Sequence, residues 1–411
     1  MGDAADVIVI GGGPAGVAAA VELRRQGVER VTLLEREASL GGATRHCGHS
    51  PFGMREFGRV YSGPAYARRL EAELERHGVT VRRGHSVVSL HDEEARLTVA
   101  CDGVVSQLGA ERIIVATGAR EASRAARLLP GDRPVGVLST GALQGYVALH
   151  GLMPFRHPVI LGSELVTFSA VLTCLRHGAR PVAVVEALPY ALARAPASWF
   201  PALAGVPFFR NAALLDIRGG ARVESVRISQ AGKTRDIACD GVLVTGHFVP
   251  EASLFLSSGM GLAHGAQAPA TDQDGRCANP LYFACGNVLR AVETGGWAFR
   301  EGRAVGAAVA RDLAQPRAPG RRDVPRVAVA FEPPVKLVVP GYVRADDTAP
   351  GALGAFQLRF TARVRGELSL ELDGARVWAR RGEFLPERRV LAPMPAGLRA
   401  AQRITFRFRE N

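Results

Sequence analysis

The sequence predicts an α/β protein with two doubly wound units and a small β-rich domain, and three observations support this fold class. A short apolar strand runs into the glycine-rich turn of residues 11–16 and then into a helix of small residues. The same order of strand, turn, helix and strand recurs over residues 158–186. Beyond residue 326 the pattern changes to alternating runs such as "FQLRFTARV". Together they predict two Rossmann-like dinucleotide-binding domains followed by β-sheet.

The first unit is built from short apolar strands. Asp6–Ile10 is a continuous apolar run of the kind buried in parallel sheets, and Val31–Leu34 is a second strand, followed by Glu35. Residues 63–78 predict a helix because proline stands near their start and glycine at their end. Residues 80–106 are rich in strand patterns, and "RIIVATGAR" at 112–120 is a further buried strand that ends in glycine.

The order of these elements predicts a discontinuous first domain. We expect residues 1–122 and 246–313 to form an FAD-binding domain, with an NAD(P)-binding-like domain at 123–245 inserted into it. Residues 314–326 are rich in proline and arginine and predict a linker. Residues 327–411 then form the β-rich C-terminal domain.

Composition excludes several classes of protein. The net charge of +12 comes mostly from scattered arginines, which predicts a diffuse basic surface and no nucleic-acid partner. Six cysteines lie far apart with no CxxC pair, so we expect free thiols in a reducing compartment, and neither a metal site nor a cysteine-ligated iron–sulfur cluster. No signal peptide or transmembrane segment is evident. The expected location is the cytoplasm.

The glycine turn predicts a dinucleotide site. Gly11 permits the tight turn, Gly13 lets the backbone approach a pyrophosphate, and Gly16 allows close contact between helix and strand. The helix N-terminus offers unpaired N–H groups to the phosphates. Glu35 ends the next strand and accepts hydrogen bonds from ribose hydroxyls.

Three later features favour FAD over NAD at this site. "ATG" at 116–118 suits a strand end near the adenine half, and "ACGN" at 284–287 suits the ribityl chain. A helix over Phe299–Leu313 aims its N-terminus at the pyrimidine edge of the flavin. Trp297 is either a flavin contact or a packed aromatic side chain. The predicted FAD-binding residues are Gly11, Gly13, Pro14, Ala15, Gly16, Glu35, Arg36, Gly42, Ala43, Thr44, Ala116, Thr117, Gly118, Gly286, Asn287, Trp297 and Ala298.

These motifs, with "LGGATRHCGHSPFG" and "SGPAYARRL", resemble the pyridine nucleotide–disulfide oxidoreductase superfamily. Within it the chain is similar to FAD subunits found alongside glycerol-3-phosphate-dehydrogenase-like proteins, and to flavin subunits of opine oxidase and hydrogen cyanide synthase. The resemblance covers nearly the whole chain. Asn287 stands where such flavoproteins usually have aspartate, and it still offers an acceptor to the ribityl chain.

The resemblance also makes the stretch Leu40–Gly53 informative. Disulfide reductases have two cysteines here, two and seven residues after the glycine pair, but this chain has Thr44 and His49 at those places. The single Cys47 cannot form an internal redox disulfide, so the usual dithiol route is not expected. Cys47 and His49 are candidate catalytic residues beside the flavin, His49 as a proton donor or acceptor. The alternative for each is local hydrogen bonding or packing.

The second unit departs from the dinucleotide pattern. Glu164 and Thr167 stand where the second and third glycines belong after Gly162. A glutamate there would crowd and repel a pyrophosphate, and a β-branched residue would push the helix from the strand. Glu186 preserves the acidic residue that would bind the ribose of a dinucleotide. We therefore expect an intact fold in which NAD(P)H binding is impaired.

The function implied by the resemblance is that of an FAD-dependent oxidoreductase, one component of a dehydrogenase or oxidase complex. Its substrate class would be an amino acid, imino acid, opine or polyol phosphate, and its partner a second redox subunit, either a flavoprotein or an iron–sulfur protein. The alternatives are a free-standing NAD(P)H-dependent flavin reductase and a non-enzymatic flavin scaffold or redox sensor. The β-rich domain would either form a docking surface or stabilise the FAD-binding domain.

Overall fold

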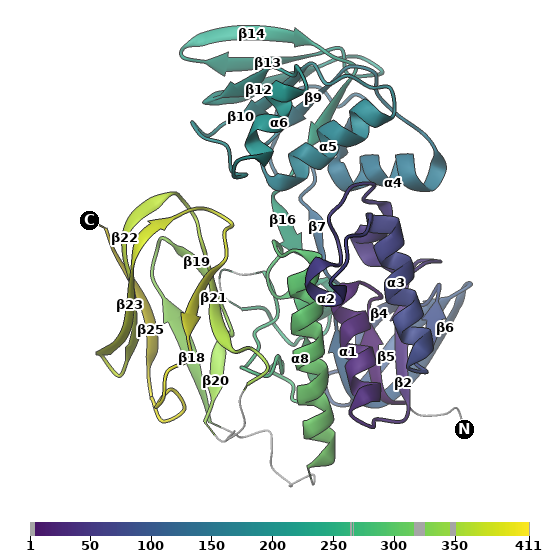
Figure 1. Ribbon diagram of the computed structural model, residues 1–411, viewed down its shortest axis with the longest axis vertical. Helices are drawn as coiled ribbons and strands as arrows, with labels where there is room; N and C mark the ends of the chain where they lie inside the picture. Colours follow the sequence, from purple (N-terminus) through teal and green to yellow (C-terminus); the bar gives the residue numbers. More distant parts are fainter. Residues whose placement is uncertain (1–4, 264, 266, 316–324, 346–350, 411) are drawn as a thin grey trace.

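A computed structural model describes residues 5–263, 265, 267–315, 325–345 and 351–410. It contains two units built on parallel sheets and a β-rich C-terminal part, which confirms the predicted fold class (Figure 1). The second unit lies at the top of the view and the C-terminal strands at the left. Helix α8 lies between those strands and the rest of the first unit (Figure 1).

The first sheet has the strand order β3-β2-β1-β6-β5-β4, and β17 pairs with β6. Val7 of β1 lies opposite Val31 of β2 and Arg112 of β6, all in parallel. Because β17 comes from far along the chain and completes this sheet, the first unit is assembled from two separate stretches. The strands are β1 (Ala5–Ile10), β2 (Val31–Glu35), β3 (Thr80–Arg83), β4 (Ser86–Leu90), β5 (Arg96–Cys101), β6 (Val104–Val115) and β17 (Tyr282–Ala284).

Helices α1 (Pro14–Arg25) and α8 (Gly295–Ala314) pack against each other through glycines. A Cβ atom added at Gly302 would lie 2.0 Å from the carbonyl oxygen of Ala15, so only glycine permits this approach. Helix α8 begins four residues before the predicted Phe299, directly after Thr294, which has an extended conformation and forms no side-chain cap. Trp297 therefore lies in its first turn. Helix α3 spans Gly63–Arg76, close to the predicted helix.

The second unit has a parallel sheet of order β11-β10-β9-β15-β8. Its strands are β8 (Val137–Ser139), β9 (Pro158–Leu161), β10 (Ala183–Glu186), β11 (Phe208–Arg210) and β15 (Gly241–Val244), with helices α4 (Thr140–His150) and α5 (Leu165–Arg176). An antiparallel sheet of β12 (Ala212–Arg218), β13 (Ser225–Gln230) and β14 (Lys233–Ala238) adjoins it. The antiparallel pair β7 (Ala119–Glu121) and β16 (Phe248–Pro250) connects the two units.

The C-terminal part consists of two sheets around an aromatic core that includes Phe356, Phe360 and Phe406. Its strands are β18 (Arg326–Phe331), β19 (Val335–Val339), β20 (Tyr342–Arg344), β21 (Ala355–Phe360), β22 (Val364–Leu372), β23 (Ala375–Phe384), β24 (Val390–Pro393) and β25 (Ile404–Glu410). Residues 316–324 of the predicted linker lie outside the described residues.

The remaining helical elements are short: η1 (Gly42–His46), α2 (Met54–Phe57), η2 (Ala197–Trp199), α6 (Phe200–Leu203), α7 (Ser253–Ser257) and η3 (Gly286–Val288). In the described ranges, no helix has both the length and the apolar character that a membrane crossing requires. The same ranges hold no group of three or more His, Cys, Asp or Glu side chains arranged to bind a metal ion.

Candidate functional site

The first glycine turn is shaped by two close backbone approaches. Gly11 has a φ of +105°, and a Cβ atom there would lie 2.5 Å from the carbonyl oxygen of Ala116. A Cβ atom at Gly16 would lie 2.0 Å from the carbonyl oxygen of Gly11. At Gly13, by contrast, an added Cβ would meet no described atom within 4 Å. The turn is therefore tight on the protein side and open on the side that a ligand would approach.

The open side faces the first turn of α1, which begins at Pro14 and Ala15. No side chain caps this helix, so its N-terminal N–H groups remain available for phosphate oxygens. Gly42 forms a second wall, because a Cβ there would lie 3.1 Å from the Cα of Gly13. The predicted glycines at 11–16 and 42 thus meet at one place.

Glu35 is almost fully buried and holds the turn in place. Its carboxylate accepts hydrogen bonds from the backbone N–H of Gly12 at 2.8 Å and of Glu37 at 3.0 Å. Each carboxylate oxygen has further acceptor capacity, so Glu35 can also receive ribose hydroxyls. Arg36 is exposed and lies 3.6 Å from the carboxylate of Glu37.

The strand end at Ala116–Gly118 borders the same space. Ala116 is buried against the glycine turn, and the hydroxyl of Thr117 donates to the carbonyl oxygen of Glu251 at 2.6 Å. Gly118 has a φ of +79°, and an added Cβ would again meet nothing within 4 Å. The predicted adenine side is therefore unobstructed.

The predicted ribityl contact contains an unpaired acceptor. Asn287 donates from Nδ2 to the carbonyl oxygen of Glu293 at 3.2 Å, while its Oδ1 atom is buried without a partner. A buried polar atom without a partner is costly, and a ligand hydroxyl would satisfy it. A Cβ added at Gly286 would lie 2.7 Å from the Cβ of Ala15 and 3.8 Å from that of Ala298. These residues fit the ribityl part of FAD.

Not every predicted FAD residue has a free polar group. The Thr44 hydroxyl is buried and donates to the carbonyl oxygen of Gly41 at 2.7 Å. Ala43 is exposed, and its carbonyl oxygen accepts from Cys47. The Trp297 ring lies beneath the guanidinium of Arg389, 3.5 Å from the Arg389 Cζ to the ring centroid. Thr44 and Ala43 therefore shape the turn through their backbone.

Cys47 lies between the two units. Its thiol donates to the carbonyl oxygen of Ala43 at 3.2 Å and lies 3.4 Å from the Oε1 atom of Gln144 on α4. Gln144 in turn donates to the hydroxyl of Ser169 on α5 at 2.5 Å. Burial, reinforced by the negative charge of Glu121, raises the pKa of the Cys47 thiol to about 12. The group is a neutral hydrogen-bond donor at physiological pH.

We expect Cys47 to resist alkylation. At pH 8 its thiolate fraction is about a thousandfold below that of an unperturbed thiol, so iodoacetamide should modify Cys47 in the folded protein about a thousandfold more slowly than in the urea-unfolded chain. Peptide mass spectrometry over a time course measures both rates. Equal rates in the two states would contradict a buried, protonated thiol.

His49 follows on the same segment. Its Nδ1 atom lies 3.4 Å from the carbonyl oxygen of Ser50, and its ring centroid lies 5.2 Å from that of Phe52. Burial lowers the pKa of His49, and the neighbouring Arg176 lowers it further. The imidazole is therefore neutral at neutral pH, which suits a proton acceptor better than a donor.

The second glycine turn is filled by the chain itself. A Cβ added at Gly246 would lie 2.0 Å from the Oε1 atom of Glu164, although Gly246 ends its strand as Gly118 does in the first unit. The hydroxyl of Thr245 donates to the Glu164 carboxylate at 3.1 Å and lies 2.8 Å from that of Thr167. The Glu164 side chain thus occupies the space that stays open over the first turn, and Thr245 and Thr167 hydrogen-bond to each other beside it.

Glu186, the acidic residue of the second unit, already forms hydrogen bonds within the protein. Glu186 accepts from the hydroxyl of Ser163 and from the backbone N–H of Leu188, the latter at 2.9 Å. The following segment closes over this point, because the Leu192 N–H donates to the Ser163 hydroxyl at 3.0 Å. In the C-terminal part, Arg388 donates to the Leu192 carbonyl oxygen at 3.0 Å.

We expect Glu164→Gln to stabilise the protein at neutral and alkaline pH but not at pH 4.5. Burial, with repulsion from Glu186, raises the pKa of Glu164 from its usual 4.5 to about 7. The folded state therefore binds its proton more tightly than the unfolded state, and folding stability falls as the pH rises from about 4.5 through 7. The variant should gain on the order of 2 kcal/mol at pH 8 and little at pH 4.5, measured by thermal unfolding at each pH. The exposed Glu75→Gln is the control, and an advantage independent of pH would contradict the assignment.

Residue-pattern reasoning missed a buried ion network beside Asn287. Arg290 and Arg359 are each 1% exposed, and they pair with Glu301 and Glu293, respectively. Glu301 also accepts from the N–H of Gly286 at 2.7 Å, and its other oxygen lies 3.3 Å from the Nε2 atom of Gln357. Since Arg359 and Gln357 belong to β21, the network attaches the C-terminal part to the candidate ribityl site.

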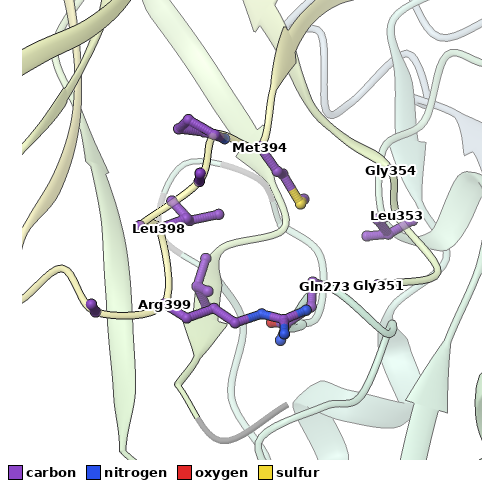
Figure 2. Close-up of a pocket in the computed structure, with 12 residues that line it drawn as sticks. Gln273, Gly351, Leu353, Gly354, Met394, Leu398 and Arg399 are labelled. Atoms are coloured by element: carbon purple, nitrogen blue, oxygen red, sulfur yellow. The ribbon is translucent and has the colours of Figure 1, made fainter. Parts of the chain in front are cut away.

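A cavity in the C-terminal part lies elsewhere. It measures about 520 Å³ and lies between Gln273 and loops of the C-terminal part, with Leu353, Met394, Leu398 and Arg399 around it (Figure 2). None of the predicted FAD or catalytic residues lines it. This cavity is separate from the candidate site.

Comparison with known proteins agrees with the geometry. A family model described as pyridine nucleotide-disulphide oxidoreductase matches residues 5–304. The chain is 31% identical to hydrogen cyanide synthase subunit HcnB of Pseudomonas protegens, over 44% of this chain and 38% of that protein. It is 27% identical to an opine oxidase subunit of Agrobacterium tumefaciens, over 70% of this chain and 62% of that protein. The chain thus spans less than two thirds of either relative.

A solved structure with the same fold is thioredoxin reductase of T. acidophilum. The two share 20% sequence identity with a TM-score of 0.63, and the match covers 75% of this chain and 99% of that chain. At this level of identity the similarity concerns the fold alone.

Proposed function

Because this chain belongs to the pyridine nucleotide-disulphide oxidoreductase family of FAD-binding, NAD(P)H-utilising flavoproteins, we propose that it is the electron-transferring FAD subunit of a multi-subunit dehydrogenase or oxidase. Its substrate class is an amino acid, imino acid, opine or polyol phosphate. Its partner is a second redox protein, either a flavoprotein or an iron–sulfur protein. The relatives named as subunits of opine oxidase and hydrogen cyanide synthase support the heteromeric assignment.

One observation carries the proposal: the two glycine turns differ in what fills them. The space beside Gly13 and Gly118 is open, whereas the matching space beside Gly246 holds the carboxylate of Glu164. The Glu164 side chain excludes a pyrophosphate from that place, and above its pKa of about 7 the ionised carboxylate also repels one. The first unit therefore suits FAD, and the second is a poor host for NAD(P)H. Electrons then come from a partner or a substrate.

Disulfide reduction by a dithiol is not part of the proposal. Cys47 is a free thiol with a pKa of about 12, and its neighbours are Ala43 and Gln144. Thr44 and His49 occupy the places of the two reactive cysteines. A neutral, single thiol is a weak nucleophile and has no resolving partner.

Bound FAD would supply the acceptance and release of electrons, in one- or two-electron steps. The chain's own residues do the binding and the positioning. The N-terminus of α1 holds the pyrophosphate, Glu35 holds the adenosine ribose, and Asn287 receives a ribityl hydroxyl at its free Oδ1. The α8 N-terminus, which no side chain caps, places positive potential near Trp297. The protonated thiol of Cys47 donates a hydrogen bond to the side chain of Gln144 and so links the two units.

Three measurements test the proposal. Purified protein should carry FAD, seen as flavin absorbance, or take it up when FAD is added. Stopped-flow mixing with NADH or NADPH should bleach that flavin slowly and without saturation in the micromolar range. Co-purification from the native source should recover a second redox protein. Rapid bleaching at micromolar NADH would favour a free-standing NAD(P)H-dependent reductase, and protein that remains colourless with FAD would overturn the assignment.

A further inference from the structure

The first turn of α8 carries a tryptophan surrounded by arginines. The Cζ atoms of Arg389, Arg55 and Arg300 lie 3.5, 4.7 and 5.4 Å from the ring centroid of Trp297. Arg55 belongs to α2 and Arg389 to the loop between β23 and β24. Three elements that are far apart in the sequence therefore bring positive charge to one indole ring.

These arginines are poorly neutralised by the protein. The Glu293 carboxylate lies 3.7 Å from Arg389, but its other oxygen already pairs with the buried Arg359. Among the described residues, no carboxylate oxygen lies within 4.0 Å of a side-chain nitrogen of Arg55 or Arg300. The wider group has five guanidinium groups and three carboxylates: Arg55, Arg290, Arg300, Arg359 and Arg389, with Glu56, Glu293 and Glu301.

Glu56 lies beside the same first turn of α8 as the Arg55 side chain, but one of its carboxylate oxygens is already engaged. Glu56 accepts from the hydroxyl of Tyr66 at 2.5 Å. Its other oxygen would lie 2.9 Å from a Cβ atom added at Gly296. Glu56 and Glu293 therefore offset only part of the positive charge near Trp297. Burial, with Arg290 and Arg55, lowers the pKa of Arg389, while Glu293 and Glu301 raise it.

Contact with the Trp297 ring leaves N–H groups of these arginines able to bind anions. A guanidinium that lies over an aromatic face uses its flat side for that contact and keeps its in-plane N–H groups free. Those N–H groups form paired hydrogen bonds with carboxylate or phosphate oxygens. Arg55 and Arg300 are exposed, and the side chain of Arg389 is 18% exposed, so solutes reach them.

We propose that Arg55, Arg300 and Arg389 around Trp297 form a binding site for the carboxylate or phosphate group of an anionic small molecule. That this molecule is the substrate rests on the proposed function, whereas the binding of an anion does not. The substrate classes proposed above all carry one of these groups. Placing it beside the α8 N-terminus would hold the substrate near the predicted pyrimidine edge of the flavin.

Calorimetric titration of the FAD-loaded protein with four probes tests this site. Acetate and L-proline represent carboxylates, and inorganic phosphate and glycerol 3-phosphate represent phosphates, all at constant ionic strength. We expect saturable binding of at least one class, weakened about tenfold by Arg300→Gln and again by Arg55→Gln. Both residues are exposed, so neither change touches the buried ion network. The class that binds more tightly identifies the substrate group.

Arg180→Gln is the matched control because it removes one exposed positive charge from the second unit. It should leave binding unchanged. Trp297→Leu should weaken binding because the stacking surface is lost, while Trp297→Phe should retain most of it. No saturable binding of any probe, or equal effects of Arg180→Gln and Arg300→Gln, would overturn the inference. If the protein took up no FAD, the same titration would be made on the flavin-free protein, and saturable anion binding there would defeat the proposed function alone.

Discussion

Gly13→Val is expected to give a stably folded protein that does not retain FAD. A Cβ atom added at Gly13 would meet no described atom within 4 Å, and the backbone there is extended with a φ of −76°, so we expect the protein itself to accommodate valine. The same volume is where the pyrophosphate must approach the backbone and the N-terminus of α1. We expect FAD affinity to fall by more than about a hundredfold, since the phosphates could no longer approach the backbone or accept hydrogen bonds from its N–H groups. Flavin content after FAD addition and gel filtration measures the loss.

Two companion variants separate ligand exclusion from misfolding. Gly16→Val places a Cβ atom 2.0 Å from the carbonyl oxygen of Gly11, so it should lower thermal stability as well as flavin content. Gly382→Val has open space around its Cβ, as Gly13 does, but lies in β23 of the C-terminal part and should remain fully yellow. Full flavin content in Gly13→Val would place the cofactor elsewhere.

The glycine pattern made the first unit predictable from sequence. Two of these glycines have a local cause that sequence spacing reveals, namely a positive φ at Gly11 and a close approach at Gly16. Glu164 was predictable as an obstruction for the same reason. The sequence could not predict that the Glu164 carboxylate covers Gly246. This contact joins residues about eighty positions apart and depends on how β9 and β15 pair.

The ion network shows where sequence reasoning stops. Arg359 lies in the run "AFQLRF", where alternation gives no sign that an arginine is buried, and its partner Glu293 lies 66 residues away. A charged residue is rarely buried without a partner, and a partner on another element cannot be read from local pattern. The start of α8 was missed for a related reason: Gly295 and Gly296 disfavour helix in isolation, and packing against α1 and α2 compensates.

Glu301→Gln is expected to produce a large loss of stability. Glu301 neutralises Arg290, which is 1% exposed, and accepts from the N–H of Gly286. Glutamine keeps the shape but removes the closest counter-charge of Arg290, whose remaining acid, Glu293, is 4.0 Å away and already pairs with Arg359, so we expect a loss of about 3 kcal/mol. The urea midpoint of the first unit, followed by flavin fluorescence, should fall markedly, and flavin should dissociate earlier because Gly286 positions Asn287. Glu367→Gln on β22 is the control, since its carboxylate pairs with Arg376 and Arg381 on the exposed face and its loss should change little.

A double replacement distinguishes uncompensated charge from lost packing. Arg290→Met combined with Glu301→Leu removes both charges and keeps most of the buried volume. Replacing both members of a buried ion pair by apolar residues is often close to neutral, whereas removing one member is not. The double variant should therefore recover much of the stability that Glu301→Gln loses, although the N–H of Gly286 and the Nε2 atom of Gln357 lose an acceptor. If the double variant were less stable than Glu301→Gln, the network would act through packing and hydrogen bonds. In that case, neutralising the charge of Arg290 would not be the main role of Glu301.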